Sequence, residues 1–584
     1  EGTDYSDDGG TSDLNDIVIT AGNTSGTVTF NPTTDTVCEI GNETATITIS
    51  SVSGGGASIY DGSQSVSITI TEPDEFVCGI QTNYSSSNAA TKLGESEFNF
   101  TNDALSGTSG LSSQSNFEVI NLHKAKGGYG LTGDGQTVGI IDSGFNTSHN
   151  EFNGTSRTIT AVGSLSSNSA SNFHGAAVSG ILAADDDGVG VEGVADEADL
   201  RLCELPSITT TSGFNSLVTC MNDFTNNSAV VVNQSWGLND FNADDLDLYI
   251  AENPGYSVTQ LLQYGLVDFR NDSSSIVDSW RDYDGALDST MQTAIDNYIT
   301  ALNNFQANGV VIQSNSNSTY EVDADIFAAL PTFYSQLAEA WIAVINIEVD
   351  GASGSESYSL QSAPCGQAKT YCLGADGYQM AGVAIGTTNY YNITSGTSYA
   401  APQVAGAVAL LNEAFPNHTP EMIVDRLLAT GQNSTSLIGS HTGAVTFGNN
   451  IQHGYNANYG HGLMDVYAAL NPITSSSYSQ SNNQLGENLG DGTEGNNGNG
   501  QSSSSNDIPL KTKVINSQGQ VIETEAITSY ITTGQSLGDG LQNNLSSVQN
   551  YFYDALDGGF KYMEQQTKEQ IIPMMAEHQT LMIL

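Results

Sequence analysis

Apolar and polar positions follow two different periods along residues 118–472. Four short apolar runs have the composition of strands, and three of them are mostly Val and Ile, which is typical of strands buried on both faces. The runs are Thr137–Ile141, Ala229–Asn233, Val310–Gln313 and Trp341–Ile347. Between them, apolar residues recur at helical spacing, as in Thr290–Gln306. This alternation predicts an α/β fold in which helices flank a parallel sheet.

The N-terminal residues 1–76 show a different pattern, because polar and apolar residues alternate there with the period of strands. The alternating runs are Thr27–Phe30, Thr44–Ile49 and Ser65–Ile70, and glycine-containing breaks separate them. We therefore expect a small all-β, sandwich-like unit over 1–76. Residues 77–117 show little periodicity and predict a linker, or an extended arm packed on the next domain.

Two further segments follow the α/β region. Residues 473–507 are almost all Ser, Asn, Gly and Gln, and they predict a disordered linker. Over 508–584 apolar residues return at helical spacing and predict a partly helical C-terminal tail. The expected amphipathic helix is marked by Leu537, Leu541, Leu545, Val548, Phe552 and Ala555. Inside the α/β region, residues 238–289 form an acidic insertion whose sequence pattern predicts neither a structure nor a role.

Charge narrows the range of partners. The chain of 584 residues has 13 basic and 65 acidic residues and a net charge of −52. Nucleic acid is not an expected partner, since binding phosphates needs clustered Lys and Arg, and an anionic membrane would repel the chain. We expect a secreted or surface-exposed protein whose carboxylates have access to divalent cations. Neither a transmembrane helix nor a signal peptide is expected, because no apolar stretch is long enough.

The six cysteines fall into three pairs that are close in sequence. The pairs are Cys38 and Cys78, Cys203 and Cys220, and Cys365 and Cys372. No spacing typical of a zinc site occurs among them. The even count favours disulfides and an oxidising compartment, with free buried thiols as the alternative.

Three polar residues stand where apolar runs begin or end. Ser398 precedes a helical run, so the free N–H groups of a first helical turn surround it. Asp142 closes a strand-like run, and His174 opens another apolar helix. Alone, Ser398 is explained equally well as a helix cap and Asp142 as an Asp turn or cap, and a histidine at a helix start is more often structural than catalytic. Together they supply the acid, base and hydroxyl that a serine nucleophile requires.

The motifs around these residues are similar to the three active-site motifs of subtilisin-like serine proteases. They read DSG at Asp142, HGAAVSG at His174 and GTSYAAPQVAG at Ser398, in the chain order that subtilisin has. The resemblance covers 118–472 and ends with YGHGLMDVYAAL at Tyr459–Leu470. It implies that Ser398 is the nucleophile, that His174 is the general base, and that Asp142 orients His174.

The same resemblance implies a substrate strand and an oxyanion hole. VVNQSWG resembles the strand that lines the family's cleft, so the backbone of Ser235, Trp236 and Gly237 would pair with substrate as an added strand. VVIQSNSNS stands where the family has a strand followed by A-A-G-N. That match makes Asn317 the oxyanion-hole amide, with Asn315 as the competing candidate.

The chain departs from the family pattern at three positions near these residues. Ser316 replaces the glycine beside the oxyanion amide, Ala176 replaces the usual threonine after His-Gly, and Ser179 replaces an alanine behind the base. The changes at Ala176 and Ser179 remove no catalytic group, but they alter the packing behind His174. An inhibitory propeptide of the usual kind is not visible between the β unit and the protease region.

Further resemblances concern the flanking regions and the loops. Residues 1–76 resemble a Calx-beta repeat that is short at its start, and acidic loops of that family can bind calcium. Paired cysteines like Cys365 and Cys372 occur in bacterial surface subtilases. The run 536–560 resembles the segment before the membrane barrel of serine-protease autotransporters, which implies surface or outer-membrane attachment through missing segments. The loop Asp185–Asp187 is compatible with structural calcium, although a solvated acidic loop is the alternative.

The predicted function is a secreted or surface-displayed serine endopeptidase that cleaves polypeptides through an acyl-enzyme on Ser398, with no cofactor for catalysis. The alternative is a surface adhesin, or a component of a filament or layer, that has the same fold and a blocked or unused cleft. The complete acid, base and hydroxyl set favours the enzyme.

Overall fold

The computed structural model of the protein describes most of residues 84–473 and short strands near both ends of the chain. Within that range the residues it does not describe are 100–114, 155–156, 167–171, 239–240, 272–286, 352, 385–390, 449–450 and 472. The chain divides into two compact units, Glu1–Gly79 and Ile80–Leu584. All of the predicted site residues lie in the second unit.

An eight-stranded sheet forms the centre of the second unit, with the strand order β12-β11-β10-β9-β6-β8-β7 and with β13 also paired to β11. The strands are β6 (Thr137–Asp142), β7 (Ile159–Val162), β8 (Asp199–Glu204), β9 (Val231–Gln234), β10 (Val310–Ser314), β11 (Trp341–Asp350), β12 (Ser357–Leu360) and β13 (Cys372–Ala375). Only β12 pairs antiparallel with its neighbour. The predicted parallel α/β fold is therefore confirmed.

The strands form where the apolar runs predicted them. Val138, Ile140 and Ile141 of β6 are fully buried, as are Val231 and Val232 of β9. Alternate residues of these strands contribute to two separate hydrophobic clusters, one on each face of the sheet. Burial on both faces explains why these strands are nearly continuous Val and Ile runs instead of alternating polar and apolar residues.

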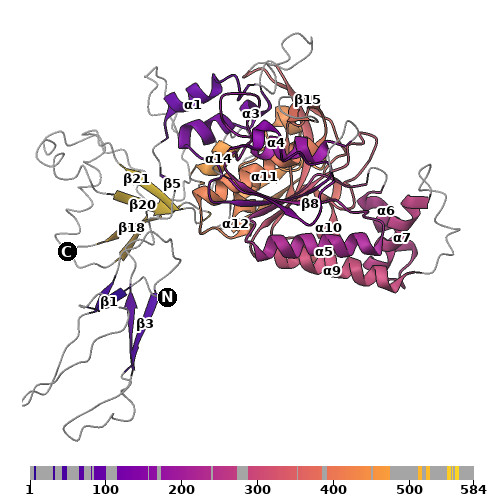
Figure 1. Ribbon diagram of the computed structural model, residues 1–584, viewed down its shortest axis with the longest axis horizontal. Helices are drawn as coiled ribbons and strands as arrows, with labels where there is room; N and C mark the ends of the chain where they lie inside the picture. The colour runs from indigo at the N-terminus through magenta and orange to yellow at the C-terminus, as the bar shows by residue number, and fades with distance from the viewer. Residues whose placement is uncertain are drawn as a thin grey trace, which may run out of the picture. The chain divides into compact units, whose positions relative to one another are not determined.

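Helices cover both faces of the sheet (Figure 1). Helices α4 (His174–Ala183) and α11 (Thr397–Ala414) pack against each other and contribute to one hydrophobic cluster. Helices α5 (Thr211–Asn226) and α9 (Ser289–Gln306) pack together in the other cluster. The predicted helix Thr290–Gln306 is confirmed by α9.

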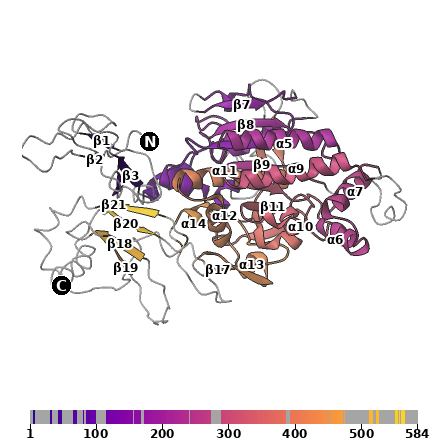
Figure 2. The ribbon, with the colours of Figure 1, turned by 90° about the horizontal axis from the view of Figure 1, so that it is seen from below.

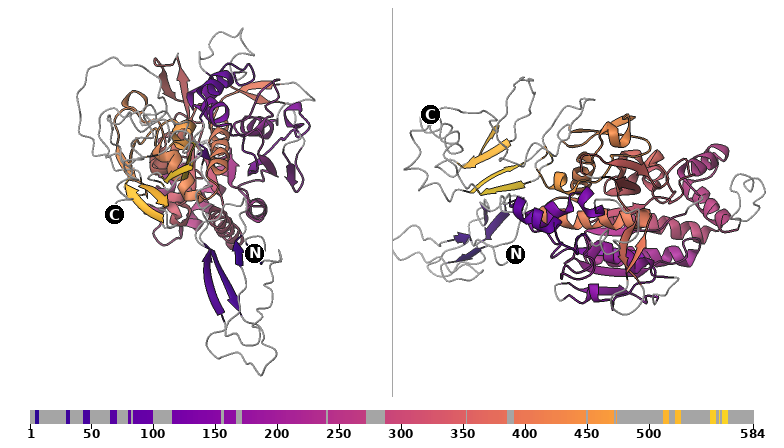
Figure 3. Two further views of the ribbon diagram at one scale, coloured as in Figure 1. Left: turned by 90° about the vertical axis from the view of Figure 1, so that its left-hand side faces the viewer. Right: turned by 90° about the horizontal axis from the view of Figure 1, so that it is seen from above.

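The unassigned insertion 238–289 contributes two helices, α6 (Ala243–Glu252) and α7 (Val258–Asn271). Asn242 caps α6 through a capping box with Asp245. The Thr259 hydroxyl of α7 donates to the Asp296 carboxylate of α9 over 2.6 Å. Figure 2 shows α6 and α7 together beside α9 and α10 (Leu330–Phe333), and the right panel of Figure 3 shows these helices at one end of the α/β body.

Smaller elements complete the α/β region. Two hairpins pair β14 (Met380–Val383) with β15 (Tyr391–Thr394), and β16 (Gly443–Thr446) with β17 (Gln452–Tyr455). Three further α-helices follow α11 in the described part of this region: α12 (Pro420–Ala429), α13 (Thr435–Ile438) and α14 (Val466–Leu470). Disulfides join Cys203 to Cys220 and Cys365 to Cys372, as the local pairing predicts. The predicted pair of Cys38 and Cys78 lies outside the described residues.

The predicted linker 77–117 contains more regular structure than its sequence suggests. It holds the short strand β5 (Ile80–Gln81), the helix α1 (Ser86–Leu93) and the start of α3 (Asn116–Val119). An extended conformation is therefore wrong for Ser86–Leu93. The Ser85 side chain caps α1, and α1 packs on the π-helix η2 (Lys124–Tyr129). Tertiary contacts thus stabilise a helix too short and too polar to be recognised from its pattern.

The described residues near both chain ends are strands. In the first unit β1 (Tyr5–Asp7) pairs with β2 (Phe30–Pro32), and β3 (Glu43–Thr48) pairs with β4 (Ser65–Ile70). The last two strands match the predicted runs Thr44–Ile49 and Ser65–Ile70. Of the predicted run Thr27–Phe30, only Phe30 is described, and it begins β2. Residues 474–507 of the predicted linker lie outside the described part.

The C-terminal tail corrects one prediction. Its described strands are β18 (Lys511–Ile515), β19 (Val521–Glu525), β20 (Gln549–Tyr553) and β21 (Gly559–Met563). The expected amphipathic helix is wrong at its C-terminal end, because β20 occupies that stretch and pairs with β18 and β21. Tyr551, Phe552 and Tyr553 have high strand propensity, which outweighs the helical spacing of single apolar residues. The rest of the expected helix lies outside the described residues.

Candidate active site

The candidate site begins at the carboxyl edge of the parallel sheet. Strand β6 ends at Asp142, and its two neighbours in the sheet are β8 and β9. Strands β7 and β8 lie on one side of β6 in the sheet. Strands β9, β10 and β11 lie on the other side. In open parallel sheets, ligands bind beyond the carboxyl ends of the strands at such a change of direction. Asp142 and Ser235, which follow β6 and β9, therefore lie at the favoured edge.

Asp142 and His174 form a hydrogen-bonded pair. Nδ1 of His174 lies 2.8 Å from Oδ1 and 3.0 Å from Oδ2 of Asp142. The Asp142 side chain is 2 % exposed, whereas that of His174 is 35 % exposed. The carboxylate also accepts the N–H of Ser143 over 2.7 Å, which fixes its orientation. Asp142 thus holds the Nδ1 edge of the His174 ring, while the partly exposed ring leaves its Nε2 edge free of this contact.

The Asp142 carboxylate controls the basicity of His174. Burial alone would lower the pKa of the imidazole, because it disfavours the charged form. The charge of Asp142 and its hydrogen bond outweigh burial and raise the pKa of His174 above its ordinary value of 6.5. An imidazole with a raised pKa is a stronger acceptor for a hydroxyl proton.

Ser398 is the second residue of α11, and the first turn of this helix lies beside His174. The ring of Tyr399, the next residue, is 5.5 Å from the His174 ring between centroids. The Ser398 hydroxyl donates to the Ser235 carbonyl over 3.2 Å instead of to His174. Within the described part of the chain, the N–H of Ser398 has no acceptor. This N–H is therefore available to a negatively charged oxygen.

Asn317 lies directly against the turn before Ser398. Its Oδ1 accepts the N–H of Thr397 over 2.8 Å and the Thr397 hydroxyl over 3.1 Å. A Cβ on Gly396 would lie 2.8 Å from the same oxygen, and Gly396 has φ +150°, so glycine is needed there. With Oδ1 held, the Asn317 amide nitrogen has no protein acceptor among the described residues and can serve a bound group.

The competing candidate, Asn315, is fully engaged in the loop. Its amide nitrogen donates to the carbonyls of Ala363 and Pro364 over 3.1 and 2.9 Å. Its Oδ1 accepts the N–H groups of Ser316 and Asp325 over 2.9 and 2.7 Å. Asn315 is 4 % exposed. The geometry therefore favours Asn317 over Asn315 as a donor to substrate.

The predicted substrate strand has one exposed residue. Gly237 is exposed, while Ser235 and Trp236 are buried, and the Trp236 ring packs on Phe327 with centroids 5.1 Å apart. Both preceding carbonyls have protein partners, since Ser235 accepts the Ser398 hydroxyl and Trp236 accepts the Gln313 amide. These two carbonyls are therefore already engaged within the protein, and pairing of this strand with substrate stays a prediction.

Asp325 supports this strand and was missed in the sequence. It is fully buried, and its carboxylate accepts the N–H groups of Leu238 over 2.5 Å and Phe327 over 2.8 Å. Burial raises its pKa to about 8, although these backbone donors oppose the shift. A Cβ on Gly237 would lie 2.7 Å from the carboxylate. An acid in DADIF carries no signal for this role, because its partner is 87 residues away.

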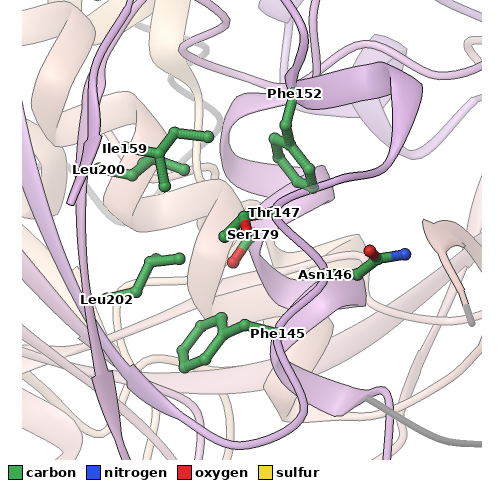
Figure 4. Close-up of a pocket in the computed structure, with 8 residues that line it drawn as sticks. All are labelled: Phe145, Asn146, Thr147, Phe152, Ile159, Ser179, Leu200 and Leu202. Atoms are coloured by element: carbon green, nitrogen blue, oxygen red, sulfur yellow. The ribbon is translucent and has the colours of Figure 1, made fainter. Parts of the chain in front are cut away.

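The departures from the family pattern lie behind His174. Ala176 is fully buried in α4, and the Ser179 hydroxyl donates to the Gly175 carbonyl over 2.6 Å. Figure 4 shows Ser179 in an apolar pocket, where Phe145 and Phe152 lie opposite the side chains of β7 and β8. The pocket is lined by Phe145, Asn146, Thr147, Phe152, Ile159, Ser179, Leu200 and Leu202. Because it includes none of the acid, base and hydroxyl set, it is not the candidate site.

The acidic loop after α4 has protein cations as partners. Asp185 pairs with Arg157, and Asp186 lies 2.5 Å from the Lys92 ammonium. Glu95 and Glu192 share the same ammonium, each at 2.7 Å. The carboxylates of Glu95, Asp186 and Glu192 are close enough together to hold one ion, but Lys92 already supplies the charge. Structural calcium at this loop stays a prediction, and this charge balance gives it no support.

None of the described helices is both long and apolar enough to cross a bilayer.

The sequence profile of the subtilase family matches residues 133–462, more than half of the 584 residues. An extracellular serine protease of Serratia marcescens is 26 % identical over 325 residues, which are 50 % of this chain and 29 % of that protein. This chain therefore spans less than a third of that relative's length.

Solved proteases give weaker likenesses. Fervidolysin from Fervidobacterium pennivorans, described as a keratinolytic enzyme related to subtilisin, is 20 % identical with a TM-score of 0.36, covering 58 % of this chain and 43 % of its own. The prenylagaramide maturation protease PagA is 16 % identical with a TM-score of 0.36, covering 57 % of this chain and 92 % of its own. The fold assignment rests on the strand order and the two helical layers described above.

Proposed function

This chain belongs to the subtilase family, and on that basis we propose that it is a serine endopeptidase whose nucleophile is Ser398. The observation that carries the proposal is the arrangement at the edge of β6 and β9. There, His174 is held by Asp142 and lies beside the first turn of α11, which carries Ser398. An acid, a base and a hydroxyl in this relation activate the hydroxyl for attack on a carbonyl carbon.

The residues divide the steps of acyl transfer among them. Nε2 of His174 takes the Ser398 proton as Oγ attacks the peptide carbonyl, and then gives that proton to the leaving amine. Asp142 stays ionised and stabilises the imidazolium. The carbonyl oxygen, now negative, accepts from the Ser398 N–H and from the Asn317 amide, for which the described residues provide no other acceptor. Water then repeats the sequence on the acyl-enzyme and releases the acid.

The proposed substrate is an extended polypeptide. It would lie along Ser235–Gly237 as an added strand and gain affinity mainly from main-chain hydrogen bonds. Such binding tolerates many sequences. Gly237 is the exposed member of this strand, and the nearby Asp325 leaves no room for a side chain there. We therefore expect the main chain of Gly237 to contact substrate.

We place the protein outside the cell. The two disulfides in the described part of the chain suit an oxidising compartment, and the similar Serratia marcescens protein is named as extracellular. Display on the cell surface, by analogy with autotransporters, is part of this proposal, as is a Calx-beta-like role for residues 1–76. No cofactor enters the proposed reaction.

Replacement of Ser398 tests the function. We expect the wild-type protein to hydrolyse a mixed peptide library and Ser398→Ala to reduce turnover by about 10⁴-fold or more, with an unchanged melting temperature. The adhesin alternative predicts that neither protein cleaves any peptide. A Ser398→Ala protein that cleaves as fast as wild type would contradict the proposal.

A further inference from the structure

Helix α11 contains a proline in its second turn, and this proline affects Ser398. In an α-helix the carbonyl of residue i accepts the N–H of residue i+4. Pro402 is that residue for Ser398, and proline has no N–H. The Ser398 carbonyl is therefore deprived of its helical donor at the point where the chain carries the proposed nucleophile. Since α11 is buried there, water cannot easily supply the missing donor.

A side chain from the neighbouring sheet supplies it. The Ser235 hydroxyl donates to the Ser398 carbonyl over 3.0 Å. The Ser235 carbonyl in turn accepts the Ser398 hydroxyl over 3.2 Å. The two residues thus exchange a pair of hydrogen bonds between the end of β9 and the first turn of α11. Ser235 is 3 % exposed and Ser398 is 8 % exposed, so both bonds form largely out of water.

Asn233 orients the hydroxyl that makes this contact. Its amide nitrogen donates to the Ser235 oxygen over 2.8 Å, and Asn233 is fully buried. A hydroxyl has one hydrogen to donate, so an incoming bond from Asn233 turns that hydrogen toward the Ser398 carbonyl. The Oδ1 of Asn233 has no partner within the described residues. A buried, half-satisfied amide is costly, which indicates that its position matters.

We propose that the Ser235 side chain is a positioning residue for Ser398, standing in for the N–H that Pro402 lacks and locking the nucleophile to the substrate strand. This inference rests on the proposed peptidase function. The Ser235 backbone would contact substrate and its side chain would hold the serine that attacks it. One residue thereby sets the distance between the bound peptide and Oγ, and small errors in that distance are costly to acyl transfer.

The first test is removal of the hydroxyl. We expect Ser235→Ala to lower kcat by about tenfold or more while KM changes little, because the substrate strand keeps its backbone. Ser235→Cys retains a weak donor of similar size, so its kcat should lie between those of Ser235→Ala and wild type. The control is Ser216→Ala on the exposed face of α5, where the hydroxyl bonds only to its own helix at Ser212, and which should keep wild-type kinetics.

The decisive test restores the helical donor. Pro402→Ala gives the Ser398 carbonyl an N–H from its own helix, so the Ser235 hydroxyl becomes dispensable. We therefore expect Ser235→Ala to cost much less kcat in the Pro402→Ala protein than in wild type. Asn233→Ala should add little to Ser235→Ala, because it acts only through that hydroxyl.

Each outcome decides between the proposals. An equal loss of kcat from Ser235→Ala in both backgrounds, or no loss in either, would overturn the positioning role and leave the peptidase function standing. A change confined to melting temperature, with kcat kept, would also overturn it. A wild-type protein that neither cleaves peptides nor reacts at Ser398 with a fluorophosphonate would overturn the peptidase function, and the positioning role with it.

Discussion

Two clusters of polar groups in the α/β region satisfy their hydrogen bonds in different ways. The site cluster consists of Asp142, His174, Asn317 and Ser398. Among the described residues, the outer edge of His174, the Asn317 amide nitrogen and the Ser398 N–H have no protein partner. The groups behind them are held by hydrogen bonds, so these three atoms are left available to a bound group.

The ionic cluster, by contrast, consists of Lys92, Lys126, Asp186, Glu192 and Asp196. Lys92 binds Glu192 at 2.7 Å, and Lys126 pairs with Asp196 and donates to the Gly193 carbonyl over 2.9 Å. Both lysines are almost fully buried. Charges out of water must be paired, and these cations are matched by neighbouring carboxylates. The ionic cluster is thus arranged for stability, and the site cluster has the free polar atoms that the proposed chemistry requires.

The largest effect should come from the acid of the site cluster. Asp142→Asn is expected to lower kcat by about 10⁴-fold, because an amide cannot hold His174 in the required tautomer or stabilise its charged form. Loss of the carboxylate also lowers the pKa of His174, so the acid limb of the pH–activity profile should move to lower pH. Steady-state rates across pH measure both changes. An unshifted limb would contradict the assigned role.

Breaking the ionic cluster should change stability and leave the chemistry intact. Lys92→Met leaves the Glu192 carboxylate, whose side chain is fully buried, without its nearest cation, and should destabilise the protein by about 3–5 kcal/mol. Denaturant unfolding measures the loss. The control is Lys369→Met, since Lys369 only approaches the Gly366 carbonyl at 3.4 Å, and it should cost little. A fall in kcat of the folded Lys92→Met protein would contradict the assignment of the ionic cluster to stability alone.

Asn315 and Asn317, in the loop after β10, repeat this contrast between a structural and a proposed chemical role. Asn317→Ala should reduce kcat by about 10²–10³-fold, because it removes the proposed oxyanion donor. Its effect on unfolding should be the smaller of the two, since it removes only the Oδ1 bonds to Thr397. Asn315→Ala should instead lower stability, since Asn315 bonds to Ala363, Pro364 and Asp325. Kinetics and thermal melts on both variants test this. The reverse pattern would make Asn315 the oxyanion donor.

The smallest effect concerns histidines with opposite pKa shifts. Burial lowers the pKa of His461 to about 4, whereas that of His174 is raised. Between pH 6.5 and about 4, His461 is protonated in the unfolded chain but not in the folded one. The free energy of unfolding should therefore decrease as the pH is lowered through this range, by roughly 1.4 kcal/mol per pH unit at most. Melting temperatures of His461→Gln should depend less steeply on pH over this range. An equal slope in both proteins would exclude His461 as the cause.

The sequence predicts the sheet and the site residues for a physical reason. Strands buried on both faces and helices with one apolar face leave periodic patterns, so β6, β10, β11 and α9 are found nearly to their ends. Asp142, His174 and Ser398 stand at the ends of such elements, where sequence motifs are local. Their roles stay predictions until activity is measured.

The features that the sequence missed depend on contacts between distant residues. Lys92 meets Glu192 across 100 positions, and the Ser235 hydroxyl meets Ser398 across 163. Helix α1 is short and polar, and its packing on η2 decides its conformation. The helix expected around Phe552 failed for the opposite reason, because a periodic pattern was overridden by strand pairing in β20.

The most direct test of the central claim is covalent labelling of the folded wild-type protein with a fluorophosphonate, followed by peptide mapping. A fluorophosphonate reacts with a serine only where a base activates the hydroxyl and donors hold the resulting oxyanion. We expect one phosphonylated residue, Ser398, and no labelling of Ser398→Ala or of the unfolded wild type. Absence of labelling in the folded protein, or labelling of a different serine, would contradict the account.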